Sequence, residues 1–336
     1  MPRKALHIND HIVKPGTTAR LALESAQLYS NSPVYMPVRV FHGKKSGPTL
    51  LLSAAIHGDE INGIEIIRQV LADIDVSKLS GTIIAVPIVN QLGFIQRTRY
   101  LPDRRDLNRA FPGIENGSLA SRVAYQFMEN IVRHASHIID LHTAAIHRTN
   151  LPQIRTDISD TENLEMAQAF GLPVVLNSEV IDGSLRYAAG QNGQHAITFE
   201  GGEALRFNDD AIAAGVQGVK NVLAHLGMFK QDEAPRKLNP TIANSSLWVR
   251  ADTDGMLVTD VALGTHVEKG QVLGTINAPL EDSPTRVKSP INGIVIGQTT
   301  IPLVHQGEAL FHIASFKQVS SVAEKIGELR AFVENT

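Results

Sequence analysis

The sequence predicts an α/β domain, a largely parallel mixed sheet flanked by helices, followed by a small all-β domain. Between residues 33 and 228, short apolar stretches alternate with longer segments of helical periodicity, the pattern of strand–helix units around a mostly parallel sheet. Residues 230–243 are charged, contain proline and have no periodicity, which indicates a linker. Beyond them, short apolar stretches are separated by Asp-Gly, Asn-Gly and other glycines, as in hairpins.

Length and composition support two folded domains. The chain has 336 residues, more than a typical single domain, and its hydrophobic content of 43% against 19% charged residues suits a substantial core. The net charge of −3 provides no electrostatic footprint for nucleic acid or for an anionic membrane. Neither partner is therefore expected.

The absence of cysteine narrows the chemistry. With no Cys, the chain has no disulfide, no thiolate metal site and no Cys nucleophile. No stretch has the length of a membrane helix, about 20 apolar residues, and the N-terminus lacks the apolar core of a signal peptide. A cytoplasmic location is expected.

Each expected element follows from its apolar pattern. Ser118 is placed to cap a helix in which Val123, Phe127 and Ile131 recur on one face. The expected helices are 60–74, 119–133, 161–170, 185–191 and 209–226. The expected strands are 34–41, 49–56, 82–89, 137–141, 174–177 and 195–199.

The second expected strand ends in a turn that carries His57 and Glu60. A His-x-x-Glu spacing can present an imidazole and a carboxylate to one metal ion, and His142 follows another apolar run as a third candidate ligand. Two His and one Glu, with a fourth position left for water, form the ligand set of a catalytic zinc. The sequence therefore favours a metal-dependent hydrolase.

Polar residues follow three expected strands. His57 and Glu60 follow the second, His142 follows the fourth and Glu200 follows the last. The carboxyl ends of parallel strands meet at one edge of a sheet, where ligands bind, so these side chains can converge. Any one of them alone is better explained as a solvent-facing residue at a strand end. For all four together, that explanation is the weaker one.

Four motifs then occur in an order typical of one family. They are His57-Gly58-Asp59-Glu60, Arg105-Asp106-Leu107-Asn108-Arg109, Asp140-Leu141-His142-Thr143 and Thr198-Phe199-Glu200-Gly201-Gly202. Over roughly residues 33–228 the chain resembles the succinylglutamate desuccinylase/aspartoacylase family. The resemblance implies a zinc carboxypeptidase-like fold, with one zinc per chain on His57, Glu60 and His142.

The resemblance also implies further site residues. Glu200 matches the general acid/base of the family, with Glu203 a weaker rival. Asn108 and Arg109 match the pair that binds the substrate carboxylate, and Arg186 resembles a further substrate-contacting arginine. Arg99 is the nearest match to the arginine that polarises the scissile carbonyl.

Several residues keep alternative interpretations. Arg97 and Arg104 remain open for the carbonyl-polarising role beside Arg99. Asp140 can orient a ligand histidine from outside the metal shell. A second metal site at His147 is the less favoured interpretation, and three histidines are expected to be structural: His134, His137 and His195.

The region after residue 243 contains an internal repeat. Residues 249–257 parallel 287–295, and residues 267–276 parallel 304–313. The pattern resembles a biotinyl/lipoyl-like barrel-sandwich domain. Its expected hairpin tip, within 277–284, contains no Lys, and Lys288 belongs to the following strand, so neither biotin nor lipoate is expected. The expected organisation is a catalytic domain at 1–229, a linker at 230–243, a β domain at 244–316 and a C-terminal helix or tail at 317–336.

Together these observations favour a zinc-dependent amidohydrolase that acts on linear amides and cleaves a small N-acyl amino acid. A zinc carboxypeptidase acting on peptide ends is the rival hydrolase, and a non-catalytic binding module with a decayed site is the rival of another class. The intact set of His57, Glu60, His142 and Glu200 argues against the decayed site. The identity of the acyl group and of the amino acid, and whether the chain forms a homo-oligomer, stay open.

Overall fold

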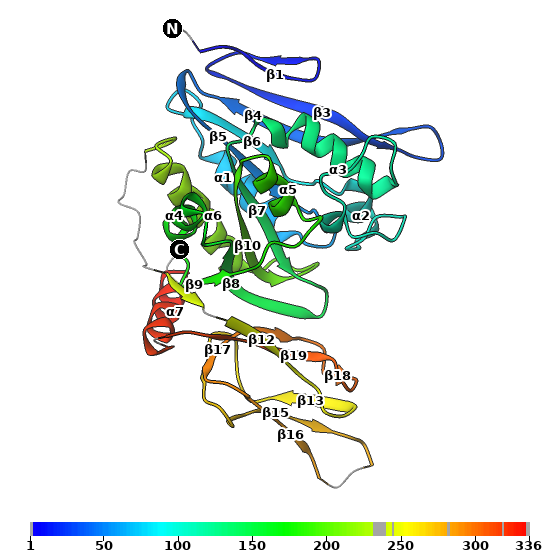
Figure 1. Ribbon diagram of the computed structural model, residues 1–336, viewed down its shortest axis with the longest axis vertical. Coiled ribbons are helices and arrows are strands. Elements are labelled where there is room, and N and C mark those ends of the chain that lie inside the picture. Colours follow the sequence, from blue (N-terminus) through cyan, green and yellow to red (C-terminus); the bar gives the residue numbers. More distant parts are fainter. Residues whose placement is uncertain (1–2, 231–239, 244, 281–282, 318, 334–336) are drawn as a thin grey trace.

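The computed structural model describes residues 3–230, 240–243, 245–280, 283–317 and 319–333 (Figure 1). A central sheet carries helices on both faces, and a second β unit continues it at one end. In the first 230 residues the strands are β1 (Leu6–Ile8), β2 (His11–Val13), β3 (Thr17–Gln27), β4 (Pro33–His42), β5 (Lys45–Ala54), β6 (Ser80–Val86), β7 (His137–Ala144), β8 (Arg148–Thr156), β9 (Val174–Asn177) and β10 (His195–Glu203).

The five helices expected between residues 60 and 226 occur at their predicted positions to within a few residues at their ends, and residues 91–96 form a further helix that was not predicted. Ser118 caps its helix by accepting a hydrogen bond from the backbone N–H of Ser121, as predicted. The helices are α1 (Asn62–Ala72), α2 (Gln91–Gln96), α3 (Leu119–Asn130), α4 (Thr161–Phe170), α5 (Leu185–Gln191), α6 (Asp209–His225) and α7 (Val319–Val333), with short 3₁₀ turns η1 (Leu107–Arg109) and η2 (Val132–His134). None of these described helices has the length and apolar character needed to cross a membrane.

Successive side chains of a strand point to opposite faces of the sheet, and each face has its own hydrophobic core. The site lies on one of these two faces. Along β7, Ile139 and Leu141 pack with α1, α4 and α6, whereas Ile138 packs in the core beneath α3 and α5. Asp140 and His142, which alternate with Ile139 and Leu141, therefore lie on the α3/α5 face. Glu200 pairs in register with His142, and Thr198 with Asp140, so β10 presents its polar side chains to the same face.

The remaining strands form the β unit after residue 240: β11 (Thr241–Ala243), β12 (Ser245–Arg250), β13 (Gly255–Thr259), β14 (His266–Val267), β15 (Val272–Asn277), β16 (Thr285–Lys288), β17 (Gly293–Thr299), β18 (Leu303–Val304) and β19 (Ala309–Ser315). The main path of the 13-stranded sheet is β12-β19-β17-β8-β10-β7-β5-β6-β4-β3, and β16-β15-β13-β18 form a separate four-stranded sheet. The part of the chain after residue 240 thus joins the sheet of the first 230 residues through the pairing of β17 with β8 and of β11 with β9 (Figure 1).

Fewer strands pair in parallel than the sequence predicted. Parallel pairing holds for β6-β5-β7-β10 and for β8-β9-β11, whereas both ends of the long sheet are antiparallel. One reason is β8, which the sequence did not reveal. It follows β7 after only residues 145–147 and runs antiparallel to β10, which lies between β7 and β8. A connection this short cannot make the crossover that a parallel strand requires.

Two boundaries also differ from the prediction. His142 and Glu200 lie within β7 and β10 rather than after them, because the pairing of these strands continues through the two residues. Thr241–Ala243, expected in the linker, pairs with Val174–Leu176 as β11. Residues 231–239 of the expected linker, and residues 281–282 of the expected hairpin tip, lie outside the described residues.

Candidate metal centre and pocket

The turn between β5 and α1 holds His57 and Glu60. Ala55 has a positive φ of 49°, and the backbone N–H of Glu60 donates to the carbonyl of His57 over 3.1 Å. At Gly58 an added Cβ would lie 2.1 Å from the carbonyl carbon of Gly93 in α2, so only glycine permits this close approach. The turn is therefore fixed by its neighbours and presents both side chains to the pocket.

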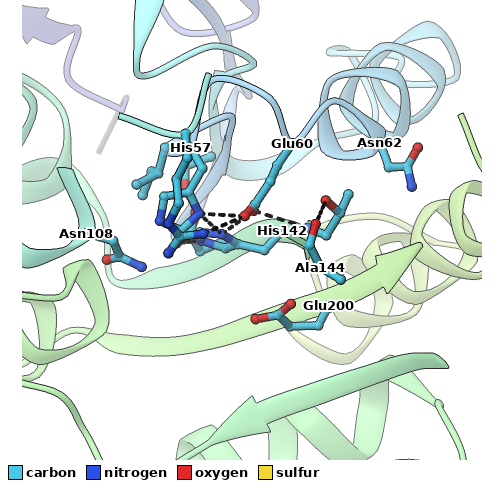
Figure 2. A network of polar contacts seen from close by, with 12 residues as sticks. His57, Glu60, Asn62, Asn108, His142, Ala144 and Glu200 are labelled. Carbon is cyan, nitrogen blue, oxygen red and sulfur yellow. Dashed lines mark hydrogen bonds and ion pairs between the residues drawn. The ribbon is translucent and has the colours of Figure 1, made fainter. Parts of the chain in front are cut away.

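His57, Glu60 and His142 direct their donor atoms to one point (Figure 2). The two Nδ1 atoms are 3.2 Å apart, and each lies 2.7 Å from a different carboxylate oxygen of Glu60. In a tetrahedral zinc site with bonds of ~2.0–2.1 Å, ligand atoms are separated by about 3.3 Å. The three side chains are buried, and among the described residues they are the one group identified that could hold a metal ion. The donor set fits zinc.

Two aspartates support the imidazoles from behind. Nε2 of His57 lies 3.1 Å from Oδ1 of Asp106, and Nε2 of His142 lies 2.7 Å from Oδ2 of Asp140. An imidazole that donates through Nε2 leaves the lone pair of Nδ1 for a metal. Ser53 in turn donates to Asp140 over 2.7 Å. Asp140 thus contacts His142 in the way expected for an orienting residue.

The charges of the cluster suit a cation. Burial by itself would raise the pKa of Glu60, but His57 and His142 outweigh it and hold that pKa below its ordinary value. Burial would also raise the pKa of Asp106, but His57 and Arg99 hold that pKa below its ordinary value. Burial lowers the pKa of His142, but Asp140 and Glu60 raise it well above its ordinary value. Ionised carboxylates face both histidines, so a divalent ion has the negative surroundings that it requires.

Glu200 lies beside the three donors and outside their group (Figure 2). Its Oε2 accepts a hydrogen bond of 3.0 Å from Nδ2 of Asn150, and its Oε1 lies 3.7 Å from Nε of Arg155. Glu203, the rival at the end of β10, instead accepts from the hydroxyl of Thr300 over 3.0 Å and does not line the pocket.

Of the three arginines considered for polarising the scissile carbonyl, one lines the pocket and two do not. Arg99 lines the pocket and donates from Nη1 to Oε1 of Glu60 over 3.1 Å and from Nη2 to Oδ2 of Asp106 over 3.0 Å. Arg97 and Arg104 do not line the pocket, and both have positive φ angles.

Asn108 and Arg109, the last two residues of η1, line the pocket. The side-chain oxygen of Asn108 accepts from the backbone N–H of Leu185 over 2.9 Å, which ties η1 to the start of α5. Arg109 is exposed, and its Nη1 donates to the carbonyl of Asn108 over 2.6 Å.

Arg186, in the first turn of α5, lines the same pocket. Nη2 donates to Ser178 Oγ over 3.3 Å and to the carbonyl of Glu179 over 3.1 Å. Nη1 is buried and has no hydrogen-bond partner among the described residues. Burial and the nearby charge of Arg155 lower the pKa of Arg186 to about 10, so the guanidinium remains cationic at neutral pH.

The pocket has a cavity volume of about 240 Å³. It includes four residues that the sequence patterns did not single out: Arg148, Asn150, Arg155 and Trp248. Trp248 belongs to β12, so the C-terminal β unit forms part of the wall. The guanidinium of Arg148 lies 5.3 Å from the centre of the Trp248 ring, which also stacks on His312 at 4.7 Å.

The sheet register explains how β12 reaches the pocket. Trp248 pairs with His312, His312 with Gly297, and Gly297 with Asn150. A Cβ at Gly297 would lie 2.9 Å from Oδ1 of Asn150, so glycine leaves room for the amide that contacts Glu200. The C-terminal unit therefore packs directly against the residues around Glu200.

The other histidines lie outside this pocket. His137 contacts Glu162 at 3.2 Å and His195 contacts Asp160 at 3.0 Å, consistent with the structural roles expected for them. His134 and His147 likewise do not line the pocket, and His147 belongs to no candidate metal group among the described residues.

Comparison with known proteins gives the family. The family model described as the succinylglutamate desuccinylase/aspartoacylase catalytic domain matches residues 46–226, which span all four motifs. The chain belongs to this family. The resemblance noted in the sequence is thereby confirmed for the catalytic domain. The likeness of the C-terminal unit to a lipoyl-like domain stays a prediction.

A comparison with one individual protein agrees with this family assignment. The chain is 26% identical over 296 residues to the N-α-acetyl-L-2,4-diaminobutyric acid deacetylase of Halomonas elongata, with 84% of this chain and 86% of the relative covered.

Solved structures show the same fold. A succinylglutamate desuccinylase/aspartoacylase from Rhodobacter sphaeroides matches with a TM-score of 0.79 at 24% identity, over 88% of this chain and 96% of that one. The ectoine utilization protein EutE (DoeB) from Ruegeria pomeroyi matches with a TM-score of 0.80 at 22% identity, over 94% and 98%.

Proposed function

We propose that this protein is a zinc-dependent hydrolase that cleaves the amide bond of a small N-acyl amino acid, releasing a carboxylate and a free amine. The observation that carries the proposal is the convergence of the donor atoms of His57, Glu60 and His142 beside Glu200 in one pocket. Family membership supports amide hydrolysis, and the Halomonas relative is by name a deacetylase.

The three donors would hold one zinc ion per chain. A zinc ion with an open position lowers the pKa of water towards 7 and polarises a carbonyl oxygen. By accepting from Nε2, Asp106 and Asp140 would leave the Nδ1 lone pair of each histidine for the zinc ion. The chain would thus supply both the ligands and the carboxylates that orient them.

Glu200 is the proposed proton carrier. Asn150 occupies one of its oxygens, and the other faces the pocket near Arg155. A carboxylate held in this way can take a proton from the attacking water and pass it to the leaving nitrogen. Arg99 is the proposed partner of the scissile carbonyl, because its guanidinium lies against Glu60 and lines the pocket.

Asn108, Arg109 and Arg186 are the proposed contacts of the substrate carboxylate. Their guanidinium and amide groups match the planar geometry of that anion. The cavity of about 240 Å³ is below the range of about 300–1,000 Å³ that is usual for drug-sized ligands, and it favours a single acylated amino acid over a peptide chain.

A hydrolysis screen tests the proposal. Zinc-loaded protein is incubated with N-acetyl and N-succinyl amino acids and with peptides, and the released amine is measured before and after zinc is removed by a chelator. We expect zinc-dependent release from at least one acyl amino acid. Cleavage of peptides alone would favour a carboxypeptidase, and failure to bind zinc would favour a decayed binding module.

A further inference from the structure

Strand β10 has a bulge directly after Glu200. From Glu200 onwards, β10 has one residue more than β7 before the two strands pair again at Glu203. The residues between are Gly201 and Gly202, and the pairing of β10 with β8 shifts at the same place. A bulge bends its strand and re-aims the neighbouring side chains. The direction in which Glu200 points therefore depends on how this bulge is held.

Asn62, the first residue of α1, holds the bulge. Its Nδ2 donates to the backbone carbonyl of Gly201 over 3.1 Å, and its Oδ1 accepts from the backbone N–H of Asn208 over 3.2 Å. Asn62 is 0% exposed, so water cannot replace these bonds. Gly202 has a φ of 79°, and an added Cβ there would lie 2.5 Å from Nδ2 of Asn62, so only glycine lets the bulge approach this amide.

The segment that contains Asn62 is itself fixed beside the candidate metal centre. Asn62 follows Glu60, one of the three converging donors, by two residues, and the carbonyl of Asp59 accepts a hydrogen bond of 2.8 Å from the backbone N–H of Leu205. A Cβ at Gly63 would lie 2.7 Å from side-chain carbons of β5 and β7, so the first turn of α1 lies directly against both strands. The Asn62 side chain points away from the three donors (Figure 2). Its contacts therefore link two parts of the site without adding a ligand.

The position of Glu200 matters for the chemistry assigned to it. A general acid/base acts within hydrogen-bond reach of the proton that it takes, and a misplacement of about 1 Å can cost about 100-fold in rate. Asn150 holds the carboxylate of Glu200 from the side of β8. Asn62 holds the backbone immediately after it, from the turn that carries two of the metal donors.

We propose that Asn62 is a positioning residue, which keeps Glu200 at a fixed distance from the metal donors through the bulge at Gly201 and Gly202. This inference rests on the proposed function, in which Glu200 carries the proton of the attacking water. Asn62 does not line the pocket. Its loss should therefore slow the chemical step and leave the binding of substrate and of zinc unaltered.

Steady-state kinetics of Asn62→Ala test this role. We expect kcat to fall by at least about 10-fold, with KM changed by less than about 2-fold and with normal zinc content. In the Glu200→Gln background the same substitution should lower kcat by less than about 2-fold, because the proton carrier that Asn62 positions is already lost. Equal falls of kcat in both backgrounds would overturn the inference.

Asn208→Ala is the matched control for stability. The Asn208 side chain caps α6 by accepting from the backbone N–H of Ala211 over 2.8 Å, so its removal destabilises the fold. The backbone N–H that bonds Asn62 remains in this variant. Asn208→Ala should unfold at a lower urea concentration and keep its kcat. A fall of kcat as large as that in Asn62→Ala would assign both losses to stability and overturn the inference.

Hydrogen exchange keeps the test independent of catalysis. In Asn62→Ala the backbone amides of residues 201–205 should exchange at least about 10-fold faster, because the bulge loses a buried hydrogen bond, while those of residues 137–142 in β7 stay unchanged. If no acyl amino acid is hydrolysed but this change is present, the proposed function fails and the role of Asn62 in holding the bulge stands. Unchanged exchange at residues 201–205 contradicts that role.

Discussion

Nδ2 of Asn150 lies 3.0 Å from Oε2 of Glu200, and the backbone of Asn150 pairs with β10 on one side and with β17 on the other. The residue that contacts Glu200 is thus held between the catalytic sheet and the C-terminal β unit. Asn150 is 5% exposed, so its amide has little freedom to turn away from the carboxylate. The C-terminal unit therefore helps to fix the orientation of Glu200.

The first prediction concerns Glu200. Glu200→Gln keeps the size of the side chain but cannot accept the proton of water, so kcat should fall by roughly 10²–10⁴. Zinc content should stay normal, because Glu200 is not among the three converging donors. Glu203→Gln is the control, since Glu203 contacts Thr300 outside the pocket. An inactive Glu203 variant beside an active Glu200 variant would reverse the assignment.

The second prediction concerns Asp140. Asp140→Asn replaces the carboxylate that accepts from Nε2 of His142, and the amide no longer selects the required tautomer. Zinc affinity should fall by about 10- to 100-fold, measured by competition with a chelator. Asp73→Asn changes an ion pair with Lys220 on the surface and should leave zinc affinity unaltered. Unchanged zinc affinity in Asp140→Asn would show that Asp140 does not orient His142 for zinc binding.

The third prediction concerns Arg109. Arg109→Ala should raise KM by about 10- to 100-fold, because a charge-assisted contact contributes about 1.5–3 kcal/mol, and zinc content should not change. Arg105→Ala is the control: the side chain of Arg105 is exposed, lies 3.8 Å from Asp103 and does not line the pocket. If KM for the best substrate were the same in Arg109→Ala as in the original protein, Arg109 would not contact the substrate.

The fourth prediction concerns pH and His312. Burial, followed by the charge of Arg155, lowers the pKa of His312 to about 3, against 6.5 for the unfolded chain. The unfolded state therefore binds one more proton between these values, and His312 makes the free energy of unfolding fall as pH drops below 6.5, by about 1.4 kcal/mol per unit.

His312→Phe keeps an aromatic ring against Trp248 and removes this titration. Between pH 8 and pH 5, urea unfolding should show that the original protein loses about 2 kcal/mol more stability than the variant. Equal losses in both proteins would show that His312 is protonated as readily in the folded chain as in the unfolded one.

The sequence predicted the parts of the site that follow apolar stretches. His57, Glu60, His142 and Glu200 were expected to meet because each follows or ends a recognisable strand, and all of them line one pocket. Helices α4 and α5 begin and end where their periodicity indicated, and each begins after a residue that caps it, Asp160 and Ser184.

Residues on β8 were missed for a physical reason. This strand contains Pro152 and places Asn150, Gln153 and Arg155 where buried strands usually have apolar side chains, so its pattern resembles a loop. Asn150 and Arg155 line the pocket, and the buried Gln153 pairs in register with Glu200. Trp248 is separated from the catalytic motifs by more than 40 residues, and only the β17–β8 pairing brings it to the site. Strand β3, by contrast, could have been found, since Leu21 and Leu23 alternate with the small or charged residues Arg20, Ala22 and Glu24.

The most direct test of the account is to measure zinc and activity together in His142→Ala. The original protein should contain about one zinc per chain and release amine from an N-acyl amino acid, because His142 supplies one of three converging donors. In His142→Ala, zinc occupancy and amine release should both be largely lost. Full zinc occupancy with undiminished amine release in that variant would contradict the proposed metal centre.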